Sequence, residues 1–273
     1  MSKKPQQIAE TISTTGINKT QFDPSRILIL ALLAGAYVGF GGQFAITIAV
    51  DAAKYTGLGI SKAIMGIVFS LGLILVVLGG AELFTGNCLM CLPVLGGKVK
   101  LRELARNWAI VYLGNFLGSI CLVYIIFNAG LYEMGSNALG ITTLGIANSK
   151  VNLTFTQAFY RGIACNWLVC LGVWLATSAE DTTGKILACK FPIMAFVGSG
   201  YEHSVANMFF VPMGIMLKEV PGLVVQSGLS LSNLNWLSFI VKNLIPVTLG
   251  NIVGGGFFVA ILYGYVYSKK TSY

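Results

Sequence analysis

The chain has 273 residues, of which 55% are hydrophobic and only 10% are charged, and its formal net charge is +8. Soluble domains carry about 25% charged residues, so the composition excludes an ordinary soluble enzyme or binding module. It predicts a protein embedded in a lipid bilayer with short loops. A basic balance is also typical of nucleic-acid-binding proteins, but these charges are scattered between apolar runs, and we expect no nucleic-acid partner.

The N-terminal residues 1–25 are polar and lack the apolar core of a secretory signal. They predict a short cytoplasmic segment, helical around Gln6–Ile12. Six apolar runs follow, each longer than the roughly 18 residues that mark a spanning helix: Ile27–Ala52, Ser61–Gly96, Ala105–Leu131, Thr154–Thr177, Gly184–Leu217 and Phe239–Tyr267. The predicted fold is therefore an all-α membrane protein, with a transmembrane domain at 26–268 and a cytoplasmic tail at 269–273.

The distribution of Lys and Arg predicts how the chain is oriented. Twelve of these residues fall on one side of the predicted spans and six on the other. By the positive-inside rule the richer side is cytoplasmic. We therefore expect a multi-pass protein of the inner (plasma) membrane with both termini in the cytoplasm.

One motif occurs twice and interrupts the second and fifth runs: Glu82 precedes Asn87 by five residues, as Glu202 precedes Asn207. Glu and Asn are costly inside apolar spans, so their repetition indicates a duplicated site. Each copy has three spans, and because three is odd, the second copy must start on the opposite side of the membrane from the first. The pattern therefore predicts an inverted 3+3 repeat, about 27–131 and 154–267, in which the second and fifth helices are broken and line a cavity.

Ionisable groups inside these spans are candidate functional residues. His203, the only histidine, lies in the second interruption and is the side chain that titrates most easily near neutral pH. Glu82 and Glu202 are expected to cap the helices that follow them, with a proton relay as the alternative. Thr85 could offer its hydroxyl to a small polar solute or bond back to its own helix.

Amides and cations complete the set of candidates. Asn166 lies in the middle of the fourth run and needs a hydrogen-bond partner, which a position beside His203 would supply. Lys150 precedes that run on the predicted outer side and would concentrate small anions, although a snorkelling side chain is the alternative. Four further asparagines are expected to satisfy backbone groups freed by the interruptions: Asn87, Asn207, Asn115 and Asn251.

The runs AELFTGN, YEHSVANMFFVPMGI, RGIACNWLVCLGVWLA and LGNIVGGGFFVA resemble the formate/nitrite transporter family. This resemblance implies a homo-pentamer of aquaporin-like protomers, each with its own pore for formate, nitrite or hydrosulfide. It also implies that His203 is the central histidine and Asn166 its hydrogen-bonding partner, with Thr85 as the loop threonine and Lys150 as the external lysine. Two apolar constrictions would be formed by six residues: Phe69, Leu73, Leu83, Phe84, Val169 and Phe196.

The resemblance implies a transport protein without catalytic residues, cofactor or metal. A carboxylate loses its hydration in an apolar constriction at high cost, whereas its neutral acid loses far less. We therefore expect a weak-acid anion, formate before nitrite, to cross with a proton supplied at His203. A hydrosulfide channel is the alternative within the family. An aquaporin-type channel for neutral solutes is less favoured, because the chain has no Asn-Pro-Ala motif.

Overall fold

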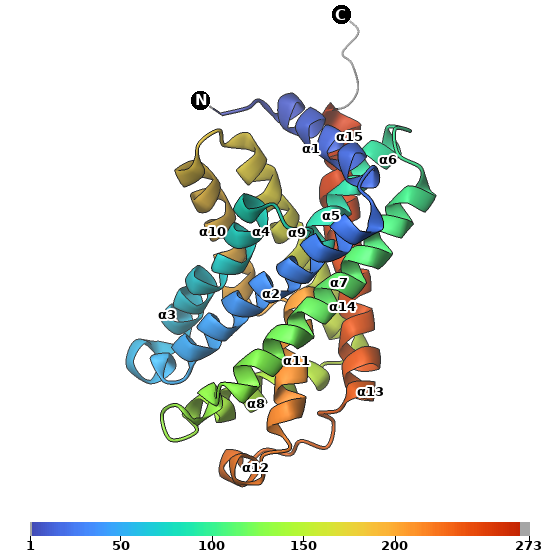
Figure 1. Ribbon diagram of the computed structural model, residues 1–273. Coiled ribbons are helices and arrows are strands. Elements are labelled where there is room, and N and C mark those ends of the chain that lie inside the picture. Colours follow the sequence, from blue (N-terminus) through green and yellow to red (C-terminus); the bar gives the residue numbers. More distant parts are fainter. Residues whose placement is uncertain (1, 268–273) are drawn as a thin grey trace, which may run out of the picture.

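The computed structural model describes residues 2–267, which form a bundle of helices with one isolated β-bridge between Ser2 and Ala179. This architecture confirms the predicted all-α class (Figure 1). The predicted tail 269–273 lies outside the described residues. Within residues 2–267, five helices are long and apolar enough to cross a membrane, or six if a pair bent by 106° is one span.

The N-terminal half comprises α1 (Pro5–Thr20), α2 (Pro24–Ala49), α3 (Ala52–Phe69), α4 (Leu71–Gly79), α5 (Phe84–Asn87), η1 (Cys88–Met90), α6 (Cys91–Leu95) and α7 (Leu101–Asn128). The C-terminal half comprises η2 (Leu131–Glu133), α8 (Ala138–Val151), α9 (Phe155–Ser178), α10 (Thr182–Gly198), α11 (Ser204–Leu217), α12 (Pro221–Ser227), α13 (Trp236–Ser238), η3 (Phe239–Leu244), α14 (Ile245–Ile252), η4 (Val253–Ile261) and α15 (Leu262–Tyr267). The segments η3 and η4 are π-helical.

The second and fifth predicted runs each contain non-helical residues. Helix α4 ends at Gly80 with φ of 76°, and the chain becomes helical again at Phe84. Likewise α10 is followed by Gly200 with φ of 74°, and α11 begins at Ser204. A left-handed backbone conformation favours glycine, which has no Cβ to clash. Both glycines therefore turn the chain where the Glu…Asn motifs begin.

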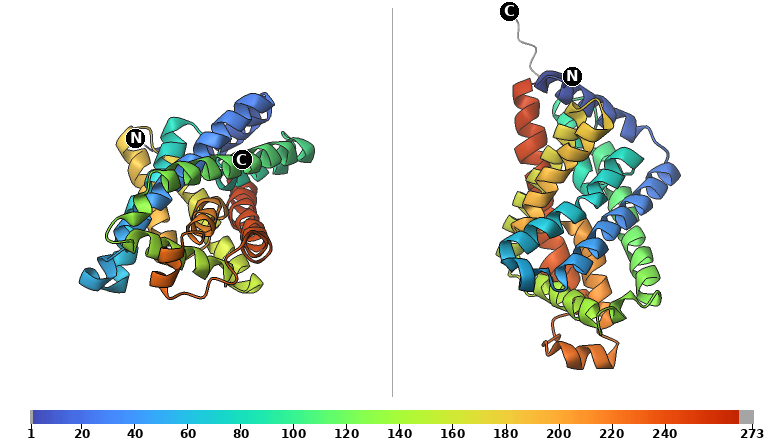
Figure 2. Two further views of the ribbon diagram at one scale, coloured as in Figure 1. Left: turned by 60° about the horizontal axis from the view of Figure 1, so that its bottom comes forward. Right: turned by 90° about the vertical axis from the view of Figure 1, so that its left-hand side faces the viewer.

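Helix α1 covers one end of the bundle, and α8 lies at the other end (Figures 1 and 2). Helix α1 is longer than predicted and buries Ile8, Ala9 and Ile12 against the cluster that contains Cys88 and Leu89. The chain before it is also anchored, since the Lys3 amide donates to the Ser178 carbonyl at 3.0 Å. The N-terminal segment is thus helical, as predicted, and packed onto the bundle.

Two helix pairs pack closely because glycines line their contacts. A Cβ added to Gly118 of α7 would lie 1.9 Å from the Leu32 carbonyl oxygen of α2. A Cβ added to Gly254 of η4 would lie 2.2 Å from the Ile163 carbonyl oxygen of α9. Small residues let helix backbones approach in membranes. Both glycines follow a Leu-Gly-Asn motif, so the motif also fixes how the helices pack.

The two halves also meet directly at one hydrogen bond. The Tyr112 hydroxyl of α7 lies 2.8 Å from the Thr248 hydroxyl of α14. Tyr112 is five residues after Asn107, and Thr248 is five residues after Asn243. Each residue therefore occupies the same position in its half of the chain.

We predict that Gly254→Ala destabilises the protein, because the added Cβ meets backbone that no side-chain rotation can relieve. The expected loss is about 3 kcal/mol, equivalent to a melting temperature roughly 6–12 °C lower in mild detergent. Gly145→Ala is the matched control, since its Cβ would meet only Leu229 Cδ1 at 4.0 Å. Equal melting temperatures for the two variants would contradict the close packing.

Candidate functional site

His203 and Thr85 join the two interruptions of the helical bundle. The Thr85 Oγ1 atom of α5 lies 2.8 Å from His203 Nε2, and both residues are buried. His203 precedes α11, and its Nδ1 accepts a hydrogen bond from the Ala206 amide at 3.0 Å. An accepting Nδ1 carries no proton, so in neutral imidazole Nε2 carries it and donates to Thr85. The Thr85 hydroxyl thus faces His203, a partner that neither alternative for Thr85 had named.

Asn166 supports this contact from α9. Its Nδ2 donates to the carbonyl oxygen of Thr85 at 3.2 Å and to that of Asn251 at 2.7 Å. The expected hydrogen bond between Asn166 and His203 is not made within residues 2–267. Asn166 instead fixes the backbone of Thr85, because carbonyls freed by the interruption need donors in an apolar setting.

A buried ion pair lies beside His203. Lys150 Nζ is 2.9 Å from Glu202 Oε1, and the two side chains are 13% and 6% exposed. Asn207 donates to Glu202 Oε2 at 2.7 Å and to Asn243 Oδ1 at 2.8 Å, and Asn243 donates to the Lys150 carbonyl at 3.0 Å. Lys150 therefore lies in the last turn of α8 as a paired cation, just before α9.

The same arrangement occurs in the other half of the chain. Lys19 Nζ of α1 lies 3.1 Å from Glu82 Oε1 and 2.6 Å from Asn87 Oδ1. Asn87 donates to Glu82 Oε2 at 2.7 Å and to Asn107 Oδ1 at 2.9 Å. Lys19, Asn107 and Asn243 were not predicted to belong to these networks. The available signal was that Asn107 and Asn243 each precede the Leu-Gly-Asn motif at equal spacing.

Asparagine side chains cap the first turn of the helix that follows each interruption. We had expected Glu82 and Glu202 to provide these caps, so that expectation is corrected. Asn115 accepts from the Phe84 amide at 2.9 Å and donates to the Glu82 carbonyl at 2.9 Å. Asn251 makes the corresponding bonds, accepting from Ser204 at 2.9 Å and donating to Glu202 at 3.0 Å. An amide can serve donor and acceptor together, whereas the carboxylates are used by the lysines.

Aromatic rings enclose His203 on one side. The Phe69 and Phe196 ring centroids are 5.7 Å apart and nearly perpendicular, and Phe210 stacks on Phe69 at 6.3 Å. Phe196 in turn stacks on His203 at 5.9 Å. Phe210 was not predicted. The buried candidates Leu73, Leu83 and Val169 belong to the same apolar cluster as these rings.

Phe84 is placed differently from the other predicted constriction residues. Its ring packs against Tyr112 at 4.9 Å and Trp108 at 5.7 Å. It lines an apolar cavity of about 620 Å³ between α7 and α14, and Leu249 lines the same cavity. The Phe84 ring therefore contacts two aromatic residues of α7, although it belongs to the same buried apolar cluster as Phe69 and Phe196.

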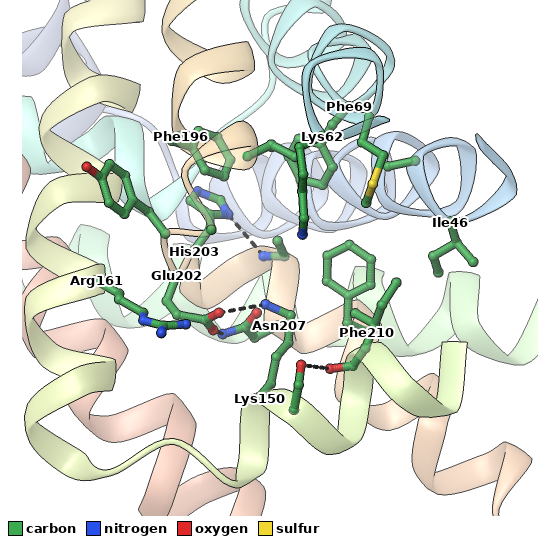
Figure 3. A pocket seen from close by; sticks show the side chains of 18 residues that line it. Ile46, Lys62, Phe69, Lys150, Arg161, Phe196, Glu202, His203, Asn207 and Phe210 are labelled. Carbon is green, nitrogen blue, oxygen red and sulfur yellow. Dashed lines mark hydrogen bonds and ion pairs between the residues drawn. The ribbon is translucent and has the colours of Figure 1, made fainter. Parts of the chain in front are cut away.

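Two cavities approach the buried centre. The first, of about 180 Å³, is lined by residues that include Lys62, Lys150, Arg161 and His203, and we name it the Lys150 vestibule (Figure 3). The second, of about 390 Å³, includes Lys19 and is named the Lys19 vestibule. Since α8 and α1 lie at opposite ends of the bundle, so do the vestibules (Figure 1).

Apolar spanning helices around a buried polar centre, with a cation-lined vestibule at each end, define a multi-pass membrane transport protein. Residues 6–265 match the family model described as formate/nitrite transporter, so the chain belongs to that family and the predicted resemblance is confirmed. The family consists of channels and transporters.

Curated relatives and solved structures agree with this assignment. The chain is 42% identical over 284 residues to a probable formate transporter of Methanothermobacter thermautotrophicus, with 98% of each chain covered. It is 36% identical to the formate channel FocA of Escherichia coli K12, covering 98% of this chain and 96% of the relative. It also resembles a pentameric formate channel solved with formate bound, at 41% identity and a TM-score of 0.81, covering 90% of this chain and 98% of that one.

We predict that Lys150 and Glu202 depend on each other for stability. Removing one member of a buried pair leaves an uncompensated charge and costs about 3–5 kcal/mol, whereas replacing both can be nearly neutral. Lys150→Met and Glu202→Gln should each lower the melting temperature in detergent by more than the double variant does. A double variant that loses the sum of the two single losses would show that the residues are not coupled.

Proposed function

We propose that the protein conducts a small monovalent weak-acid anion across the plasma membrane, and that this anion is formate. The observation that carries the proposal is the contact between His203 and Thr85, which lies between two cation-lined vestibules and among apolar side chains. Relatives described as formate channels support the choice of formate. Nitrite is next, and hydrosulfide is the alternative, because both are also small anions of weak acids.

We infer that the chain is an inverted 3+3 repeat with broken second and fifth spans. Supporting this, corresponding residues keep a constant spacing in each vestibule. Lys150 follows Lys19 at the same interval as Gly162 follows Ala31, and the carbonyls of Gly162 and Ala31 accept from Asn251 and Asn115. Each repeat then begins one helix earlier than the boundaries 27 and 154, with α1 and α8.

The distribution of basic residues supports an orientation for this repeat. Both termini and the Lys19 vestibule would face the cytoplasm, because the cytoplasmic loops carry more Lys and Arg. The Lys150 vestibule would then face outward. In this orientation an anion from outside meets Lys150 before the Phe69–Phe196 pair. Because Lys150 is paired with Glu202, it attracts the anion less strongly than an unpaired lysine would.

The apolar residues around His203 would select against charged solutes. A carboxylate that leaves the Lys150 vestibule must pass Phe69 and Phe196, which offer no hydrogen bonds to replace its hydration. Formic acid carries no charge and loses much less hydration free energy at the same place. The barrier thus favours transfer of a proton to the anion before it crosses.

His203 would supply that proton only after a local rearrangement. In the resting geometry the ring is neutral, because Nδ1 accepts from Ala206. Taking up a proton at Nδ1 requires that this bond open. The imidazolium can then donate to an anion from Nε2, directly or through the Thr85 hydroxyl. After the donation the remaining proton is on Nδ1, so it must move to Nε2 by a tautomeric exchange before Nδ1 can again accept from the Ala206 amide and reset the site.

A homo-pentamer with one pore per subunit fits this scheme. The pentameric formate channel to which the chain is similar supports the assembly. Each protomer holds both vestibules and the complete His203–Thr85 contact within one chain. Subunits would therefore pack by their outer helix faces without sharing the path.

We predict that His203→Asn abolishes proton-linked formate uptake, because asparagine keeps a polar side chain but has no titratable nitrogen. Uptake driven by a pH gradient into liposomes should fall at least tenfold, about 1.4 kcal/mol in barrier height. Thr85→Val is the companion variant, since it removes the hydroxyl and keeps the shape. Wild-type rates of joint formate and proton entry in His203→Asn liposomes, matched for inserted protein, would refute the relay.

We also predict that Phe196→Val admits larger anions. Valine is the residue at the corresponding position of the Lys19 vestibule, Val76, so the change is compatible with the fold. The smaller side chain opens the ring pair and should raise acetate flux relative to formate flux. Flux ratios measured in liposomes for wild type and variant test this. An unchanged ratio in a variant of normal stability would mean that Phe196 serves packing alone.

A further inference from the structure

The two vestibules correspond residue by residue, and their differences reveal which side chains are specialised. Glu82 donates its amide to the Leu30 carbonyl at 3.2 Å, and Glu202 donates its amide to the Arg161 carbonyl at 3.3 Å. Leu30 and Arg161 therefore occupy the same position, and each lines its own vestibule. Only the Lys150 vestibule has a guanidinium there.

A second cation enters the Lys150 vestibule from another helix. Lys62 of α3 directs its ammonium group into the cavity, whereas Arg161 reaches toward it from α9 (Figure 3). Within residues 2–267 neither cation forms an ion pair, and the carboxylate of Glu202 is already occupied. Its Oε1 binds Lys150, and its Oε2 accepts from Asn207 and Asn243. Two uncompensated positive charges therefore face this vestibule.

We propose that Arg161 and Lys62 form an oxyanion-docking site in the Lys150 vestibule. The guanidinium presents paired N–H donors that match two oxygens of a carboxylate or sulfate, and the ammonium adds a second charge. Two free cations match a divalent anion better than a monovalent one. The vestibule of about 180 Å³ has room for a small oxyanion.

Divalent oxyanions would bind at this site and go no further. Beyond it lie Phe69, Phe196 and Phe210, and a dianion cannot be neutralised by the single proton that His203 offers. Such an ion blocks the path from the Lys150 side alone. The Lys19 vestibule has Leu30 at the position of Arg161, and its own guanidinium, Arg26, lies over the Phe22 ring at 3.8 Å. Sulfate on that side therefore has no guanidinium at the equivalent position. A formate ion would use the same groups before passage, a role that rests on the proposed function.

The test measures formate flux while sulfate is added to one side at a time, in right-side-out and inside-out vesicles at constant ionic strength. Sulfate on the Lys150 side should inhibit wild-type flux, and sulfate on the other side should not. Arg161→Leu, which copies the corresponding residue Leu30, should raise the half-inhibiting sulfate concentration about tenfold. Lys62→Gln should act in the same direction, and Arg161→Lys should have a smaller effect because it keeps the charge.

Lys54→Gln is the matched control, because it removes an exposed cation of α3 that does not line the vestibule. Its sulfate inhibition should equal that of wild type. An equal loss of inhibition in Lys54→Gln and Arg161→Leu would overturn the site in favour of general surface charge. Equal sulfate block from both sides would also overturn it.

Binding can be measured independently of transport. Sulfate should raise the melting temperature of the detergent-purified protein, and Arg161→Leu should lose that rise while keeping its melting temperature without sulfate. If sulfate stabilises the wild type through Arg161 but formate does not cross, the proposed function fails and the site stands. If formate crosses and sulfate neither blocks it nor stabilises the protein, the site fails and the function stands.

Discussion

The structure depends on satisfying backbone groups at two places where apolar helices stop and restart. No water is available inside a bilayer to bond free amides and carbonyls, so each interruption requires dedicated partners. Asn115 and Asn251 supply them by bonding residues on both sides of the interruption. With the backbone held in this way, Thr85 and His203 can meet at the centre of the bundle.

The ion pairs around this centre explain how a charged residue is tolerated so close to the path. Lys19–Glu82 and Lys150–Glu202 are each tied to asparagines, so their charges are balanced locally. Ion pairs whose charges are balanced hold their side chains in place but produce little net electric field around them. The difference between the two ends arises from Arg161, which replaces a leucine in an otherwise similar frame. The two vestibules therefore differ at this position, where one has Arg161 and the other has Leu30.

Much of this arrangement is predictable from the sequence, because Glu, Asn and His are costly in apolar spans and their repetition is visible. The apolar runs located α2, α7 and α9 to within a few residues. Helix α8 was not predicted, because its 14 residues are too few to span a membrane. Asn251 was expected to satisfy freed backbone groups, but its partners Gly162 and Glu202 could not be named, since they are far away in the chain. Long-range pairing of this kind leaves no local pattern.

The hydrogen bond between Tyr112 and Thr248 has a consequence for how a duplicated chain can be built. In the inverted repeat that we propose, residues at corresponding positions that touch each other lie on the approximate twofold axis relating the halves. There each copy of a residue faces the other copy, so identical side chains compete for the same volume. Here the large Tyr112 and the small Thr248 fill that volume, and their hydroxyls form a hydrogen bond. At the axis itself, the two halves are therefore compelled to differ in sequence.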